Sequence, residues 1–429
     1  MNPAASAVPA RFGTRGHSLL FLSSAWLFRI GLALVTFEQI RPFFSMQVSD
    51  YCFFFSLLLL LFRPEFLSLR AQDFKILIGG WLVLLGSLVS LVNSSSLGET
   101  LAPLARFIVL FCLFAPLAVI HSADMRKNSF YLLAGISGNC VITLIQATIF
   151  PGIVDLLSVN PARPDVTVVG RFQGLTSHPN IIGLVAGLAI LLGIGLMSVE
   201  GNKSLRGWLI VAVAVCGIAA LLSGSRAVFV SLIPGLAVLA LSQKQRKRTI
   251  LRMLLALMVV WGAVTYLIPA VVSQFGERLN TSGVDISSDY GRLWSAVYAI
   301  GEISQKPIIG WGIDHLNDAG LTEVPWTGEI VGVHNTFLKY WHAAGLLGAI
   351  GFVALFVMPI RLLRSVLKRR SENAVIHMLA LGLGCCTLLF IVSNLGPFDY
   401  NRFLYIPVFL FGGFAVRARL PVPPAATLL

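Results

Sequence analysis

Hydrophobic and polar positions alternate along this chain in long blocks, and each apolar run is bounded by charges, prolines or polar clusters. A run of about 20 apolar residues is long enough to cross a bilayer as a helix. The pattern therefore predicts an all-α, polytopic transmembrane bundle that forms one integral membrane domain over residues 1–429. Its twelve predicted spans lie at 18–37, 48–62, 74–92, 104–120, 130–150, 180–197, 207–222, 226–242, 250–272, 335–360, 374–394 and 402–416.

Composition supports this interpretation, because 56% of the residues are hydrophobic and only 12% are charged. Soluble domains carry about 25% charged residues, so a single water-soluble globular core is excluded. The net charge of +13 would suggest a nucleic-acid partner in a soluble chain. In a membrane protein, the placement of the positive residues is more informative than their sum.

The basic residues are unevenly divided between the two sides of the predicted membrane. With a cytoplasmic N-terminus, 21 Lys and Arg fall inside and 10 outside, with Arg29 within a span. Positive residues favour the cytoplasmic side, so both termini are predicted to be cytoplasmic and no nucleic-acid partner is expected. The first span follows Arg11 and Arg15 without a small-residue cleavage site after it, which favours an uncleaved span over a signal peptide. The outside residues are Arg41, Arg106, Arg163, Arg171, Arg226, Arg278, Arg292, Lys306, Lys339 and Arg402.

Small residues within the predicted spans favour structural roles. The Gly-x-x-x-Gly pair Gly183 and Gly187 is typical of close helix packing, as are Gly345, Gly348 and Gly351. All six cysteines lie within predicted spans and lack metal-ligand spacing, so they are interpreted as small core residues.

Two predicted outside segments, 151–179 and 273–334, are long. Within the second, Gly291–Gln305 has the pattern of an amphipathic helix that Pro307 ends. Such a helix lies at the membrane surface or packs over the bundle, where the loop can cover an outward-facing site. Its predicted apolar face carries Leu293, Val297, Ile300 and Ile303.

Three outside arginines are candidates for ligand binding. Arg171 lies in the segment ahead of the sixth span, Arg226 ends a Ser-Gly-Ser-Arg turn, and Arg292 begins the predicted loop helix. A single arginine of this kind is equally explained by its side chain reaching the lipid headgroups. Three on one side are better explained by an anionic ligand, because guanidinium grips phosphate with two hydrogen bonds and keeps its charge.

A histidine at the same predicted face is a candidate general base. His334-Asn335 opens the tenth span, and histidine is the side chain most easily poised to accept a proton near neutral pH. The dipeptide alone favours an interfacial histidine bonded to a neighbouring carbonyl. Asp399, between the last two spans, either orients a histidine or caps a helix. The motifs of zinc hydrolases and of metal-assisted nucleotide-sugar enzymes are not found in the sequence.

Together these pieces resemble the O-antigen ligase and polysaccharide polymerase family of bacterial envelope proteins. The resemblance covers roughly residues 170–350 as an enzyme-like core, and the order of the pieces makes the set specific. The matching pieces are Arg171–Asn180, Ser-Gly-Ser-Arg226, Gly291-Arg-Leu-Trp294, Lys306-Pro-Ile-Ile-Gly-Trp-Gly312, His334-Asn-Thr-Phe-Leu338 and Gly345-Leu-Leu-Gly348.

The resemblance implies a glycosyltransferase of the bacterial inner membrane whose active site faces the periplasm. Its donor would be a glycan on undecaprenyl diphosphate, used without metal, nucleotide sugar or other cofactor. Its acceptor would be a glycan or lipid A-core, and its partners would be membrane lipids and other envelope polysaccharide assembly proteins. Ligases and polymerases of the family share these motifs. The form His178-Pro-Asn180 is more similar to that of exopolysaccharide polymerases than to that of lipopolysaccharide ligases.

Carried over to this sequence, the family's functional residues divide into two groups. The resemblance gives catalytic roles to His334, Arg292 and Arg226, and substrate-binding roles to Arg171, Asn180, Asn335 and Asp399.

A transporter or flippase of lipid-linked oligosaccharides remains the alternative. Such proteins also have about twelve spans, and they place ionisable residues near mid-membrane. Here Arg29 is the one clear candidate for that position, and the functional-looking residues instead lie at the outer face, which favours chemistry there.

Overall fold

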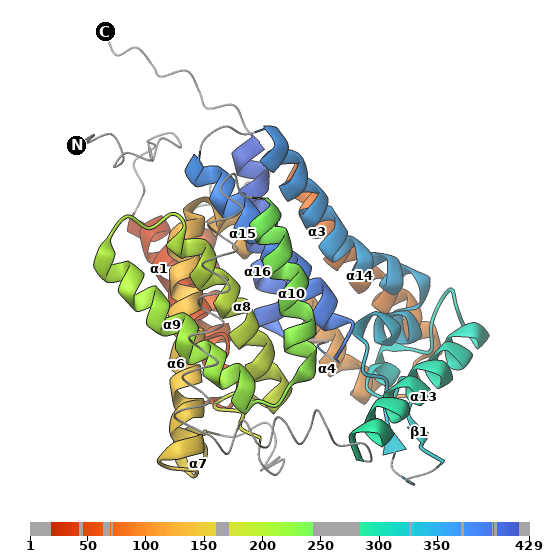
Figure 1. Ribbon diagram of the computed structural model, residues 1–429. Helices are drawn as coiled ribbons and strands as arrows, with labels where there is room; N and C mark the ends of the chain where they lie inside the picture. The colour runs from red at the N-terminus through yellow and green to blue at the C-terminus, as the bar shows by residue number, and fades with distance from the viewer. Residues whose placement is uncertain are drawn as a thin grey trace.

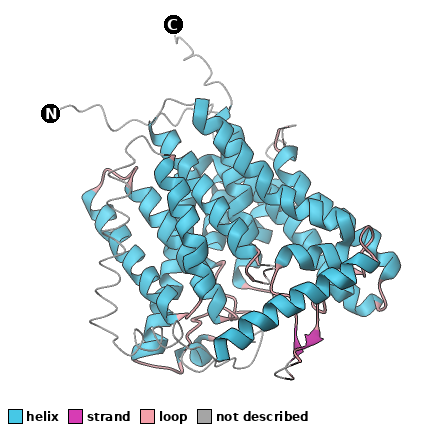
Figure 2. Cartoon of the chain, turned by 45° about the vertical axis from the view of Figure 1, so that its right-hand side comes forward, coloured by secondary structure: helices cyan, strands magenta, loops and turns pink. Residues whose placement is uncertain are grey.

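The computed structural model describes residues 19–42, 46–62, 69, 72–159, 171–242, 284–325, 328, 330–369, 373–396, 398 and 401–419. Helices dominate these ranges, and the strands β1 (Thr322–Glu323) and β2 (Ile330–Val331) form a short antiparallel hairpin (Figure 2). The all-α prediction is therefore confirmed. The α-helices are α1 (Leu19–Leu34), α2 (Val48–Leu61), α3 (Phe74–Val89), α4 (Leu97–Ile108), α5 (Ala115–Ile120), α6 (Met125–Thr148), α7 (Ile153–Leu157), α8 (Pro179–Met197), α9 (Lys203–Leu222), α10 (Arg226–Leu241), α13 (Val284–Gln305), α14 (Thr336–Arg369), α15 (Asn373–Ser393) and α16 (Arg402–Arg419).

Short helical segments of other kinds join some of these helices. A π-helical segment, η3 (Val109–Phe114), lies between α4 and α5. Single turns of 3-10 helix are η2 (Ser90–Asn93), η4 (His121–Asp124) and η5 (Ile313–Leu316).

Within the described ranges, six helical segments are long and apolar enough to cross a membrane, and α1, α2 and α10 are shorter apolar helices. Helices lie at eleven of the twelve predicted spans, whereas the predicted span at 250–272 falls outside the described residues. Helix α16 is not among the six because Arg402, Arg417 and Arg419 raise its charge. The membrane character of the chain is therefore supported, and the count of twelve spans stays a prediction.

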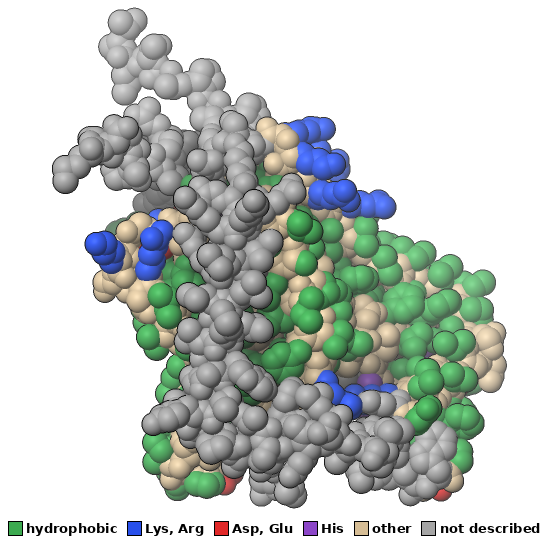
Figure 3. Space-filling model, viewed as in Figure 1, with side chains coloured by type: hydrophobic (Ala, Val, Ile, Leu, Met, Phe, Trp, Pro, Cys, Tyr) green, Lys and Arg blue, Asp and Glu red, His purple; other side chains and the backbone are tan. Residues whose placement is uncertain are grey.

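The helices of the bundle run between two ends (Figure 1), and the two ends differ in the residues that form them. At the end that we call the basic end, α8 and α14 finish and α9 and α15 begin. Figure 3 shows Lys and Arg side chains gathered there and hydrophobic side chains over the middle of the molecule. The opposite end, which we call the loop end, is formed by described residues of the segments 35–42, 90–96, 171–178, 223–225, 306–335 and 394–401.

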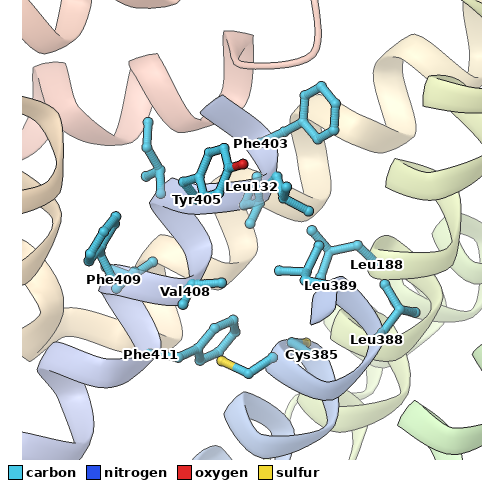
Figure 4. Close-up of a cluster of buried hydrophobic side chains, with 14 of the residues drawn as sticks. Leu132, Leu188, Cys385, Leu388, Leu389, Phe403, Tyr405, Val408, Phe409 and Phe411 are labelled. Carbon is cyan, nitrogen blue, oxygen red and sulfur yellow. The ribbon is translucent and has the colours of Figure 1, made fainter. Parts of the chain in front are cut away.

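The core runs along the helix axes, where α15 and α16 pack with α6 and α8 (Figure 4). Aromatic side chains of α16, including Phe403 and Phe409, are fully buried in it. The prediction that the cysteines are core residues holds for Cys140, Cys216, Cys385 and Cys386. It is wrong for Cys112, which is exposed, and Cys52 is half-buried.

Glycines allow two close helix contacts that the sequence predicted. A side chain on Gly351 would lie 2.6 Å from the Val83 nitrogen of α3, so α14 and α3 touch along their backbones. A side chain on Gly183 of α8 would lie 2.5 Å from Ser223 Oγ, in the turn before α10. Small residues bring apolar helices close enough for dispersion contacts when the hydrophobic effect is weak, as it is in lipid.

Candidate functional site

The segment before α8 is fastened to the turn before α10 by an arginine. Arg171 Nε donates a hydrogen bond of 2.7 Å to the Ser223 carbonyl, and its Nη2 donates to Asn180 Oδ1 at the start of α8. His178 caps that helix, because its Nδ1 accepts a 3.0 Å hydrogen bond from the Asn180 backbone. Arg171 and Asn180, both predicted site residues, are thus joined directly.

The Ser223–Arg226 turn places Arg226 as the first residue of α10. Gly224 has a φ of +61°, a conformation that favours glycine, and the chain reverses there between α9 and α10. The Arg226 side chain is half-buried at the loop end. Because Arg171 binds Ser223, the two arginines come from segments that are in direct contact.

His334 and Asn335 enter the same end of the bundle from the other side. Asn335 Nδ2 donates a 3.1 Å hydrogen bond to the Asn394 carbonyl, after the end of α15. Its Oδ1 accepts from the Leu338 backbone at 3.0 Å and so caps α14. Since α15 ends where α8 and α10 begin, the histidine and the Arg171–Arg226 pair belong to one end of the molecule.

His334 is half-buried beside two positive side chains. The pKa of His334 is lowered to about 4, by burial first and also by the positive charges of Arg292 and Lys339. All three effects disfavour imidazolium. The imidazole is therefore neutral at pH 7 and able to accept a proton, which is the state that a general base requires.

Helix α13 carries Arg292 to this position, and it differs from the prediction in two respects. It begins at Val284, seven residues before the predicted Gly291, and its packed face combines small residues with Ile303. Ser295 and Ala299 are fully buried, the latter with Val333. Of the predicted apolar face, Ile303 is buried, whereas Leu293, Val297 and Ile300 are exposed. The short side chains let α13 lie close to the loop that precedes His334, because Ser295 Oγ donates to the Gly332 carbonyl at 3.3 Å.

The segment that follows α13 packs against helix α14 at a break in that helix. At Gly345 the helix has a φ of +65°, and the Ile308 carbonyl approaches so closely that a side chain on Gly345 would lie 2.1 Å from it. Leu346 donates its backbone N–H to that carbonyl at 3.0 Å. Trp311 in turn donates its backbone N–H to the His342 carbonyl at 2.8 Å. The loop therefore completes the backbone hydrogen bonding of the broken helix.

Side chains reinforce this contact between loop and helix. The Trp311 ring stacks on His342 with 6.1 Å between centroids and an interplanar angle of 13°. Glu302 Oε2 lies 3.3 Å from His342 Nε2 and accepts a 3.0 Å hydrogen bond from the Gly320 backbone. Asp314 also accepts hydrogen bonds from the backbone and hydroxyl of Ser95, which ties the loop to the turn between η2 and α4. These contacts fix the position of α13 and so of Arg292.

The structure thus brings the predicted residues together in two groups at the loop end. Arg171, Asn180 and the Arg226 turn form one group, and Arg292, His334 and Asn335 form the other. Asp399 lies outside the described residues. Lys339, one helical turn after Asn335 and buried near His334, was not predicted as a site residue. The sequence could have indicated Lys339, because it is also a positive residue at the predicted outer end of a span, where the charge bias of membrane proteins disfavours Lys and Arg.

Fold and site define a class: an α-helical membrane protein whose loop end places arginines and a neutral histidine together. Residues 209–353 match the family model described as O-antigen ligase. This match confirms the resemblance to the O-antigen ligase and polymerase family, and it supports a role of that type in polysaccharide assembly. Arg226, Arg292, His334 and Asn335 lie within the matched range, and Arg171 and Asn180 precede it. A comparison with curated proteins gave no match.

Proposed function

We propose that this protein is a glycosyltransferase of the O-antigen ligase and polymerase type, working at the periplasmic face of the bacterial inner membrane. Its donor is a glycan linked to undecaprenyl diphosphate, and its acceptor is a sugar hydroxyl. The observation that carries the proposal is the neutral, half-buried His334 beside Arg292 within the matched family range. The proposed orientation is supported by the exposed Lys and Arg side chains at the basic end, which suit a cytoplasmic surface.

The chemistry follows from the charges that develop during transfer. The acceptor oxygen attacks the anomeric carbon as the bond from that carbon to the diphosphate oxygen breaks, and the leaving diphosphate keeps the bonding electrons. Arg292, Arg226 and Arg171 are proposed to stabilise this growing negative charge. The acceptor hydroxyl loses its proton to the His334 imidazole. A single displacement of this kind inverts the anomeric centre.

Substrate binding would also improve the base. The positive charges of Arg292 and Lys339 contribute to the low pKa of the free His334. A bound diphosphate would neutralise these charges and favour imidazolium, so the pKa would rise toward its ordinary value. The histidine would then become a stronger base when the donor is in place.

A transfer assay separates this proposal from the transporter alternative. The purified full-length protein in detergent should convert a polyprenyl-diphosphate-linked glycan into a longer or transferred product without ATP or an ion gradient. A transporter would give no new glycosidic bond under these conditions, and that result would reject the proposal.

A deletion strain distinguishes the two forms of the activity. Lipid-linked single repeats, visible when the surface polysaccharide is separated by gel, would indicate a polymerase. Long chains left on the lipid diphosphate and missing from lipid A-core would indicate a ligase.

A further inference from the structure

The outward face of α13 consists of large apolar and aromatic side chains. Leu293, Val297 and Ile300 are 61%, 58% and 55% exposed, and Tyr298 beside them is 46% exposed. We call these four residues the outer face of α13. The water-facing side of a surface helix normally carries charged or polar residues. A contiguous exposed apolar surface of this kind marks a site of contact with a membrane or with another protein.

The opposite face of α13 packs against the rest of the protein. Arg292, Ser295 and Ala299 are spaced by three and four residues and therefore share one side of the helix. Ser295 and Ala299 are fully buried, and Arg292 is half-buried. Over these two turns, the helix directs small residues and an arginine inward and large apolar residues outward. This is the reverse of the arrangement in a helix that covers a core in water.

The C-terminal end of α13 is fixed at the loop ends of α3 and α14, which both belong to candidate membrane spans. Trp311 Nε1 donates a 2.9 Å hydrogen bond to the Glu302 carbonyl, so the segment after α13 folds back on that helix. Asn93 Nδ2, at the end of the span that contains α3, donates to the Gly310 carbonyl at 2.6 Å. The same segment completes the break in α14 described above. The last turn of α13 therefore lies beside the outer ends of two spans.

An exposed apolar stripe on α14 continues toward this helix. Leu346, Ile350 and Val353 recur every three or four residues and are 43%, 47% and 38% exposed, as expected where a spanning helix faces lipid. Ile308 lies beside Leu346, whose backbone N–H binds its carbonyl, and is 72% exposed. Figure 3 shows hydrophobic side chains reaching the right-hand edge of the molecule, where Figure 1 places α14 and α13. One apolar surface thus leads from the span to α13.

Aromatic residues along this surface favour a membrane over a protein as its partner. Tyr and Trp are enriched where the apolar core of a bilayer meets water. Tyr298 belongs to the outer face of α13, and Trp341 of α14 donates its Nε1 to the Pro307 carbonyl at 3.1 Å. Continuity favours the same partner, because lipid that covers the stripe on α14 also reaches the helix beside it.

We infer that the outer face of α13 lies in the membrane leaflet at the loop end, so that α13 is an interfacial helix bound to phospholipid. Such a helix sinks its apolar face about 5–10 Å into the boundary between headgroups and acyl chains. Arg292, on the opposite face, is then held close to the level of the lipid headgroups. The inference depends on the membrane character of the chain and not on the proposed transfer reaction.

The test measures fluorescence quenching on the full-length protein in phospholipid nanodiscs. A fluorescent amino acid replaces Val297 in one variant and Glu323, exposed in the hairpin, in the matched control. Lipids with nitroxide-labelled acyl chains should remove most of the fluorescence at position 297 and little at position 323. Iodide in the water phase should have the opposite preference. Because this readout does not use transfer, it stays valid if the proposed function fails.

Three outcomes at position 297 would overturn the inference. Quenching by iodide and not by lipid would show that the outer face is in water. Protection from both quenchers would show that protein covers it, either a second copy, another chain or another part of this one. Lipid quenching equal to that at position 323 would show that the contact is not specific to this face.

A charge on the outer face gives a second, independent test. With the fluorescent amino acid at position 300, Val297→Asp should lower the quenching by lipid, because a carboxylate resists transfer from water into the apolar region. The matched variant Val297→Leu keeps the face apolar and should leave the quenching unchanged. Equal quenching in the two variants would overturn the inference. Position 300 also replaces position 297 as the labelled site if the first labelled protein fails to fold.

Discussion

The two ends of the bundle differ in how far many of their Lys and Arg side chains are exposed. At the basic end, Lys203, Arg206, Arg361, Arg364 and Lys368 are all exposed. At the loop end, Arg171, Arg226, Arg292 and Arg402 are half-buried and Lys339 is buried, whereas Arg106 is exposed. Arg171 donates to a backbone carbonyl, and Arg402 pairs with a carboxylate. An exposed Lys or Arg side chain favours the cytoplasmic side of the membrane without needing a fixed position. A charge held in a poorly hydrated position has large interactions, which suits a site for an anionic substrate.

The largest effect should come from removing the proposed base. His334→Ala should lower transfer by about 100- to 10,000-fold, the usual contribution of general base catalysis. The amount of protein in the membrane should stay the same. The measurement is the rate of glycan transfer by purified protein. His315→Ala, another histidine of the loop end, is the matched control and should change the rate by no more than about twofold. Full activity of His334→Ala would exclude the base assignment.

A smaller effect is expected from replacing an arginine by lysine, which keeps the positive charge but loses the planar guanidinium group. Arg292→Lys should lower kcat by about tenfold, because ammonium lacks the planar fork that makes two hydrogen bonds to phosphate. Arg364→Lys at the basic end should leave the kinetics unchanged, since an exposed charge there needs no fixed geometry. Equal kcat in Arg292→Lys and the wild type would mean that point charge alone suffices at the loop end.

The contact between the loop and α14 can be tested through stability. Gly345→Ala should destabilise the protein by about 1–3 kcal/mol, because alanine disfavours positive φ and its methyl group would meet the Ile308 carbonyl. Activity should fall as well, since α13 and Arg292 depend on this contact. Gly207→Ala, within α9 and with open space around it, should be neutral or stabilising. A melting temperature for Gly345→Ala equal to that of Gly207→Ala would show that the break in α14 is dispensable.

The smallest expected effect is a shift in pH dependence. With the pKa of free His334 at about 4, the base is available above that pH, and kcat/KM should fall as the pH drops through it. Lys339→Met removes a positive charge that favours the neutral ring, so the acidic limb should move to higher pH. The shift should be limited, because burial is the larger cause of the low pKa. If the pH dependence of kcat/KM is the same in Lys339→Met and the wild type, a group other than His334 controls the fall in activity at low pH.

Sequence reasoning located most candidate site residues but not their partners. Arg171, Arg226 and Arg292 were identifiable because each breaks the charge bias between the two sides of a membrane protein. Lys339 breaks it too, but its closeness to His334 depends on the direction in which the first turn of α14 faces. The packed face of α13 differs from the predicted apolar stripe for a related reason. Helical periodicity identified an apolar stripe correctly, whereas packing selected the small residues Ser295 and Ala299 for close contact.

The amino-acid sequence by itself determined the all-α membrane character of this protein, since long apolar runs in lipid must satisfy their backbone hydrogen bonds as helices. It also marked where unexpected positive charges lie. Only the tertiary structure decided which charges meet. Asn401 donates a 3.1 Å hydrogen bond to the Glu38 carboxylate, although 363 positions separate the two residues in the sequence. Such convergence depends on side-chain packing between distant helices, and local sequence patterns do not encode it.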